Sequence, residues 1–193
     1  GIATGRYRKV LIVSSEVASA GLNWNDPDTA PLFGDGAAAA VVGSCTNEAG
    51  SQFVAGHMET YSEGVEFCQV RSGGTRMRID DGVEAFTAGA RFEMSGKATY
   101  RLAAKHLPGF MDRLFERANI SIADLKKLVP HQASVKALKH LEHALKLPPN
   151  SMVRILATHG NQMAASIPIA LHSAIMSHEI KRGDLIALVG SGA

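Results

Sequence analysis

Short apolar runs alternate along this chain with longer amphipathic stretches. Residues 10–13 are all apolar, which is typical of a strand buried on both faces of a sheet that helices cover. A second apolar run of small residues follows the turn at 34–36, and residues 52–61 can form a third strand. The pattern predicts an α/β layered protein.

The Gly34–Asp35–Gly36 turn raises the question of a phosphate-binding loop. Such loops place their backbone N–H groups at the start of a helix, whereas this turn leads into a strand. The sequence therefore favours a tight structural turn. The polar segment 71–82 gives no indication of a function.

From Gly96 onward the spacing of apolar residues becomes helical. One stripe recurs at intervals of three and four residues, and Pro108 with Gly109 is expected to kink or weaken that helix. The stripe consists of Ala103, Leu107, Phe110, Met111, Leu114 and Ala118. Beyond it we expect a strand at 128–130, a helix carrying Leu138, Leu141 and Leu145, a strand at 153–156, a helix at 159–176 and a strand at 185–189.

Polar residues follow three of these strands. His131 comes directly after the strand at 128–130, Asn161 follows the strand at 153–156, and a glycine-rich turn follows Val189. In open α/β sheets, ligands gather where the carboxyl ends of neighbouring strands converge. We call the edge formed by the carboxyl ends of these three strands the carboxyl edge. The sequence thus predicts a functional site there.

Two simpler interpretations stay open for these residues. His131 and Asn161 can each cap the helix that follows, and Asn is among the best helix caps. Cys45 and Cys68 are poor nucleophiles by context, because neither stands at a helix start or beside a basic residue in sequence. A thiol nucleophile is therefore expected outside this stretch, and both chain ends look cut from within a larger fold.

Composition narrows the class of protein further. The 193 residues are 46% hydrophobic and 20% charged, with a formal net charge of +2, which does not favour a nucleic-acid surface. No run of eighteen apolar residues predicts a membrane span, and two cysteines suggest a reducing, cytoplasmic compartment. His140 and His143 beside Glu142 are too weak a signal for a metal site, so no metal is predicted.

Four motifs together resemble β-ketoacyl-ACP synthase III, a family of thiolase-like condensing enzymes. They are "LFGDGAAAAVV" at 32–42, "VPHQAS" at 129–134, "HGNQMAASIP" at 159–168 and "GSGA" at 190–193. The resemblance implies an α/β thiolase-like layered fold, α-β-α-β-α in the whole enzyme, of which this chain covers mainly the C-terminal half. Residues 1–82 would then be the end of the N-terminal half with connecting loops, and 83–193 the C-terminal half.

The same resemblance implies the chemistry of a Cys-His-Asn triad. His131 and Asn161 match its last two members, the cysteine would lie shortly before Gly1, and the Ser191 backbone N–H would hold the acyl oxygen. A malonyl thioester that loses carbon dioxide leaves an enolate, whose oxygen needs two hydrogen-bond donors. The implied substrates are acyl-CoA and malonyl-ACP, with no other cofactor.

Binding positions and partners follow from the resemblance as well. Arg101 and Lys136 match basic positions that receive the acidic carrier protein, although ordinary solvated helix charges explain them equally well. Ser134, which stands where the family usually has Asn, is a candidate substrate contact. The enzyme is expected to act as a homodimer on coenzyme A thioesters, without nucleic acid or membrane.

Three departures from the family pattern leave the substrate open. They are Ser134, the pair Gln162 and Met163, where small or hydroxyl residues are common, and "GSG" in place of an all-glycine run. An acyltransferase or a non-decarboxylating condensing relative would keep the same triad. A non-catalytic partner subunit is the third possibility.

Overall fold

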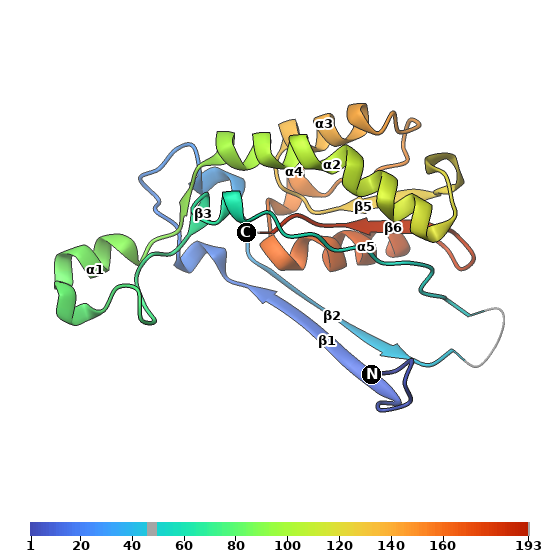
Figure 1. Cartoon of the computed structure of the whole chain (residues 1–193), viewed down its shortest axis with the longest axis horizontal. Helices are drawn as coiled ribbons and strands as arrows, with labels where there is room; N and C mark the ends of the chain where they lie inside the picture. The colour runs from blue at the N-terminus through green and yellow to red at the C-terminus, as the bar shows by residue number, and fades with distance from the viewer. Residues whose placement is uncertain (46–49, 193) are drawn as a thin grey trace.

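The computed structural model describes residues 1–45 and 50–192. Two long strands, β1 (Lys9–Glu16) and β2 (Gly36–Gly43), pair antiparallel in the register Lys9↔Gly43 to Glu16↔Gly36. Figure 1 shows this pair as a ribbon that projects away from the helices. Both predicted strands are therefore present, and the 34–36 turn does lead into a strand.

The prediction that β1 is buried on both faces is wrong for this structure. Leu11, Val13 and Val41 are 64%, 62% and 68% exposed. The ribbon packs against η6 (Met163–Ala165) and α5 (Ser166–Met176), and no helix of the described chain covers its outer part (Figure 1). An uninterrupted apolar run predicts that a strand has apolar neighbours on both faces. The described residues do not supply such neighbours to the outer part of β1.

A second, parallel pair of strands forms the buried centre. β5 (Lys127–Pro130) pairs with β6 (Ile186–Val189), in the register Lys127↔Ile186 to Pro130↔Val189. Leu128 packs into a cluster shared with α2 (Gly96–Ala118) and α3 (Val135–Ala144), whereas Val129 joins a cluster with α5. Figure 1 shows α2 and α3 on one side of this pair and α5 on the other. Here the predicted layering, a sheet between helices, is confirmed.

The strand predicted at 153–156 is displaced rather than absent. Met152 forms a parallel bridge with Leu128, and the Val153 N–H donates to the Leu128 carbonyl at 2.9 Å. A short helix, α4 (Leu156–His159), begins where the predicted strand should have continued. The Leu128 N–H also donates to the Ser151 carbonyl at 2.7 Å, so residues 151–153 lie along the edge of β5.

α2 is one continuous helix with Pro108 inside it. Met111, in the middle of the predicted stripe, is completely buried. The helix ends at Asn119, whose left-handed conformation (φ 52°) is a common way to terminate a helix. Packing of Met111, Leu107, Phe110 and Leu114 in one core cluster therefore supports the helix despite the hydrogen bond that a proline removes.

The strand predicted at 52–61 is not formed. Burial does alternate there, and the inward side chains His57, Glu59 and Tyr61 face α2 rather than a neighbouring strand. Arg113 donates two hydrogen bonds to Glu59, one of them at 2.8 Å, and the Tyr61 ring stacks on His106 at 3.7 Å. The segment is therefore held by side-chain contacts to α2, not by pairing with a strand.

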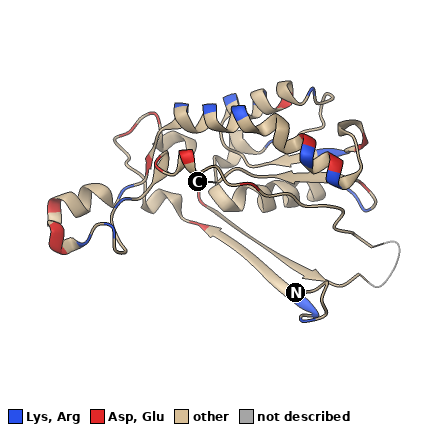
Figure 2. Cartoon of the chain, in the orientation of Figure 1, with Lys and Arg blue, Asp and Glu red and all other residues tan. Residues whose placement is uncertain are grey.

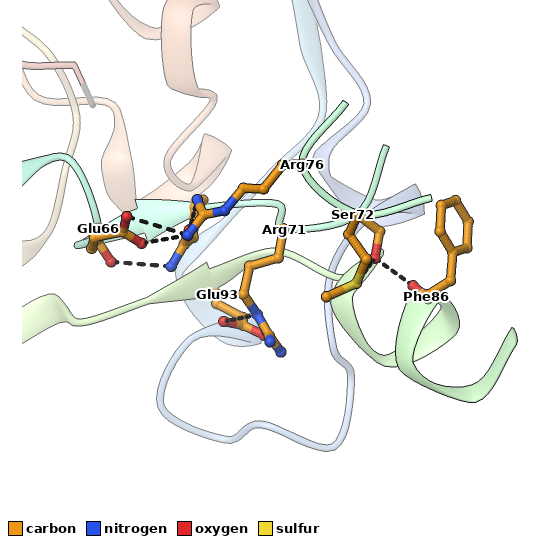
Figure 3. Close-up of polar contacts among 8 residues, drawn as sticks. Glu66, Arg71, Ser72, Arg76, Phe86 and Glu93 are labelled. Atoms are coloured by element: carbon orange, nitrogen blue, oxygen red, sulfur yellow. Dashed lines mark hydrogen bonds and ion pairs between the residues drawn. The ribbon is translucent and has the colours of Figure 1, made fainter. Parts of the chain in front are cut away.

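Residues 62–95 form an excursion that is tied to the rest of the chain at a few points, for example by the Phe92 N–H, which donates to the Gly21 carbonyl at 2.8 Å. It contains β3 (Cys68–Gln69) paired with β4 (Glu93–Met94), and α1 (Val83–Gly89), which projects at one end of the molecule (Figure 1). Figure 3 shows how it is held: Arg71 grips Glu93, Arg76 pairs with Glu66, and the Ser72 hydroxyl donates to the Phe86 carbonyl. Short 3-10 helices elsewhere are η1 (Ala18–Ala20), η2 (Ala30–Leu32), η3 (Ser62–Gly64), η4 (Ile79–Asp81), η5 (Ile122–Asp124) and η6 (Met163–Ala165).

Candidate active site

His131 lies at the carboxyl edge, one residue beyond β5. Its backbone N–H donates to the Val189 carbonyl at 2.7 Å, so the ends of β5 and β6 are joined at this residue. Because Val189 is the last residue of β6, the glycine-rich turn that follows begins beside His131. The predicted convergence of these two strand ends is confirmed.

Gln132 fixes the backbone on the other side of His131. This side chain is completely buried, and its amide nitrogen donates to the carbonyls of Pro130 (2.9 Å) and Val153 (3.2 Å). Its amide oxygen accepts from the backbone N–H groups of Ile155 (2.9 Å) and Leu156 (3.1 Å). One carboxamide therefore ties the end of β5 to the start of α4. Sequence reasoning passed over this residue, although a Gln between an apolar strand and a helix start was a usable signal.

Asn161 forms a parallel backbone bridge with Phe33 and does not lie at the start of a long helix. The single helix predicted at 159–176 is wrong, because α4 ends at His159, η6 follows Asn161, and α5 begins only at Ser166. The Asn161 backbone N–H donates to the Leu32 carbonyl at 2.7 Å, and its carbonyl accepts from the Gly34 N–H at 3.1 Å. Asn161 is thus placed by the "LFGDG" segment, more than 120 residues earlier in the chain.

Glycines make that approach possible. A Cβ on Gly34 would lie 2.0 Å from the His159 carbonyl oxygen, which no side chain can tolerate. Gly160 has a φ of +69°, a conformation natural only for glycine, and a Cβ there would also meet Phe33 and Gly34. Gly34 and Gly160 therefore let the segment around residue 34 pack closely against residues 159–160, directly before Asn161.

The Asn161 side chain is oriented by its own neighbours. Its Oδ1 accepts the Met163 N–H at 2.9 Å, and its Nδ2 donates to the Ala133 carbonyl at 3.4 Å. The side chain is only 8% exposed, so these contacts define a single orientation of the amide. Nδ2 carries two protons, and the second is left for another acceptor.

His131 and Asn161 converge through shared neighbours. Asn161 bonds to Ala133, two residues after His131, and also to Met163, whose backbone lies within hydrogen-bonding reach of the His131 ring. Burial lowers the pKa of His131 below its usual 6.5, and hydrogen bonding of the protonated ring to the Met163 backbone opposes this only in part. Burial therefore favours the neutral form of the ring. Met163 itself has a positive φ of 47°, a strained conformation that the sequence did not reveal.

The other predicted site residues lie on the surrounding surface. Ser191 is exposed two residues beyond β6, on the carboxyl edge that holds His131. The Ser134 hydroxyl accepts the Ala137 N–H at 3.1 Å and so caps α3, which gives it a structural role beside the predicted substrate contact. Arg101 on α2 and Lys136 on α3 are both exposed, on helices that pack against each other. Their roles stay predictions.

The strands between helices, with the His131 imidazole and the oriented Asn161 carboxamide at one carboxyl edge, form a thiolase-like fold. The family model of 3-oxoacyl-[acyl-carrier-protein] synthase III matches the sequence at residues 1–62, and the family model of its C-terminal part matches residues 115–193. The chain belongs to the 3-oxoacyl-[acyl-carrier-protein] synthase III family.

Individual relatives agree with this assignment. The chain is 36% identical over 192 residues to a β-ketoacyl-[acyl-carrier-protein] synthase III of Clostridioides difficile, with 99% of this chain and 57% of that protein covered. The crystal structure of the Aquifex aeolicus 3-oxoacyl-[acyl-carrier-protein] synthase III superimposes with a TM-score of 0.85 at 29% identity, covering all of this chain and 56% of that one. A priming β-ketosynthase of the R1128 polyketide pathway gives 0.83 at 29% identity, with the same coverage. The chain thus spans a little over half the length of these relatives.

Proposed function

We propose that the protein containing this chain condenses an acyl thioester with a malonyl thioester, with loss of carbon dioxide, in fatty-acid or polyketide synthesis. The observation that carries the proposal is the convergence of His131 and Asn161 on the shared neighbours Ala133 and Met163. Membership of the synthase III family supports it.

The two side chains suit the decarboxylation step. When the C–C bond to the carboxylate breaks, its electron pair enters the thioester as an enolate, and the oxygen of that enolate becomes negative. The remaining Nδ2 proton of Asn161 and the ring N–H of His131 donate to this oxygen without adding a charge of their own. The enolate carbon then attacks the acyl group held on a cysteine of the preceding segment, and the thiolate leaves. The Ser191 backbone N–H holds the acyl oxygen during that attack.

Basic residues on the helices beside the site suit an acidic carrier protein. Figure 2 shows Lys and Arg side by side along α2 and on the neighbouring α3. They include Lys97, Arg101 and Lys105 on α2, and Lys136 and Lys139 on α3. Arg101 and Lys136 are proposed to meet the carrier, and Ser134 to contact the substrate near the same helix start.

The remaining expectations are part of the same proposal. The enzyme acts as a homodimer in the cytoplasm, uses acyl-CoA and malonyl-ACP, and needs no metal or other cofactor. Residues 1–82 complete its N-terminal half, and 83–193 form its C-terminal half. In the part of the chain that is described, no helix is long and apolar enough to cross a membrane.

The test uses the full-length enzyme. Intact-mass analysis after incubation with a series of acyl-CoAs measures acyl loading, and release of labelled carbon dioxide from malonyl-ACP measures decarboxylation. Asn161→Ala should lower decarboxylation roughly 100-fold to 1000-fold while acyl loading continues. Loading without any carbon dioxide release by the parent enzyme would favour an acyltransferase, and neither activity would favour a non-catalytic subunit.

A further inference from the structure

Gln162 is a buried polar residue directly beside Asn161, and the proposed chemistry does not use it. Its side chain is only 3% exposed. The amide nitrogen donates to the Asp35 carbonyl at 2.9 Å, and the backbone N–H donates to the buried Ser166 hydroxyl at 3.1 Å. The residue is therefore held at both its backbone and the end of its side chain.

The Gln162 carboxamide fills a notch made by a glycine. A Cβ on Gly36 would lie 2.1 Å from the amide nitrogen and 2.8 Å from Cδ1 of Ile169, so the two side chains share the space that Gly36 leaves open. Asp35, whose carbonyl accepts the amide, is itself fixed, because its carboxylate accepts both the backbone N–H and the hydroxyl of Ser19. The anchor for Gln162 is thus a rigid turn.

Only one end of the Gln162 carboxamide, the amide nitrogen, makes a hydrogen bond. The amide oxygen of Gln162 is buried and has no hydrogen-bond partner among the residues that the structure describes. A buried acceptor without a partner costs free energy, so packing alone would favour an apolar side chain of this size. What the amide adds over such a side chain is the link to Asp35.

We propose that Gln162 is a positioning residue for Asn161. The Gln162 side chain bonds to Asp35, and the Asn161 backbone bonds to Leu32 and Gly34. These bonds together hold residues 32–35 against residues 161–162, and we call them the clamp. The clamp sets where the Asn161 amide presents its second Nδ2 proton. The inference rests on the proposed function, in which that proton stabilises the enolate oxygen.

Two variants break the link by different routes. Gln162→Met keeps the length of the side chain but removes the donor, and Gly36→Ala displaces the amide while residue 162 stays Gln. The matched control is Ile169→Val, which removes the other atom lining the notch and leaves the hydrogen bond intact. All three are made in the full-length enzyme.

For both test variants we expect kcat for decarboxylation of malonyl-ACP to fall roughly threefold to tenfold, the worth of one hydrogen bond. KM for malonyl-ACP, acyl loading from acyl-CoA and the activity of Ile169→Val should stay at the parent values. An unchanged kcat in Gln162→Met, a parallel loss of loading and decarboxylation, or an equal loss in Ile169→Val would overturn the proposal.

Hydrogen–deuterium exchange separates this proposal from the proposed function. Peptides containing the amides of Asn161 and Gly34 should exchange faster in Gln162→Met and Gly36→Ala than in Ile169→Val. If the parent enzyme releases no carbon dioxide, the proposed function fails, and this measurement alone decides whether the clamp exists. Unchanged exchange in both test variants would show that Gln162 does not hold Asn161.

Discussion

Arg113 on α2 grips Glu59 with its guanidinium, one of the two hydrogen bonds measuring 2.8 Å, and so binds the extended segment 52–61 to the helix. The Arg113 side chain, with help from Tyr61 and His57, holds the pKa of Glu59 at about 2, below its usual 4.5. The carboxylate therefore stabilises the folded state fully above pH 4.5, and this contribution is lost as the pH falls toward 2. Glu59→Gln should flatten the acid limb of the unfolding curve, measured by circular dichroism, and an unchanged limb would contradict the assignment.

Gln132→Leu should destabilise the protein strongly. The variant keeps the approximate volume of the side chain but leaves the buried N–H of Ile155 without an acceptor, at about 1–3 kcal/mol, and also removes the acceptor of the part-buried Leu156 N–H. Urea unfolding measures the loss, and Gln52→Leu on the exposed segment is the control. A loss below about 1 kcal/mol would mean that water replaces the amide.

Gly34→Ala should disrupt the site more than any other single methyl group added to the two turns. The new Cβ would be 2.0 Å from the His159 carbonyl oxygen, so the turn at 34–36 must move away from Asn161. We expect decarboxylation to fall at least about tenfold, as for a misplaced catalytic group. Gly43→Ala, where the added Cβ finds only ordinary contacts, serves as the control. Equal activities of the two variants would show that the close approach is dispensable.

His131 should titrate below its usual pKa of 6.5, because burial disfavours the charged ring. In the pH interval between the lowered pKa and 6.5 the unfolded chain binds more protons than the folded chain at this residue. His131 therefore makes the folded state less stable as the pH falls through that interval. The NMR titration of the His131 ring protons gives the pKa directly, with exposed His172 as the comparison. A value at or above 6.5 would contradict a buried ring.

Lys136→Glu and Arg101→Glu should weaken the encounter with the acidic carrier protein. We expect a higher KM for malonyl-ACP, with an effect that shrinks as salt is added, and unchanged loading from acyl-CoA. Lys181→Glu, an exposed position at the opposite end of β6, is the matched charge reversal. If all three variants raise KM alike, net charge and not a docking surface is responsible.

The sequence predicted the elements whose signal is local. β5, α3 and β6 lie close to their expected bounds, since each combines a distinct apolar period with a clear stop. The position of His131 directly after β5 also placed it at the carboxyl edge. All three elements were predicted from the spacing of apolar residues that are close together in the sequence.

What could not be predicted depends on partners far away in the chain. Asn161 was expected at a helix start, but its place is set by Leu32 and Gly34, and no local pattern announces that bridge. Segment 52–61 shows the same limit, because a strand was predicted there and its partner in the structure is α2. The buried role of Gln162 likewise became visible only with the packing, whereas the place of Gln132 between an apolar strand and a helix start was a local signal.

The exposed β1–β2 ribbon has a practical consequence for handling these 193 residues. Unshielded aliphatic side chains on a two-stranded ribbon with open edges are a template for intermolecular pairing, and thus for aggregation. A preparation of this stretch alone should self-associate and bind hydrophobic dyes, whereas a longer polypeptide that shields Leu11, Val13 and Val41 should stay dispersed.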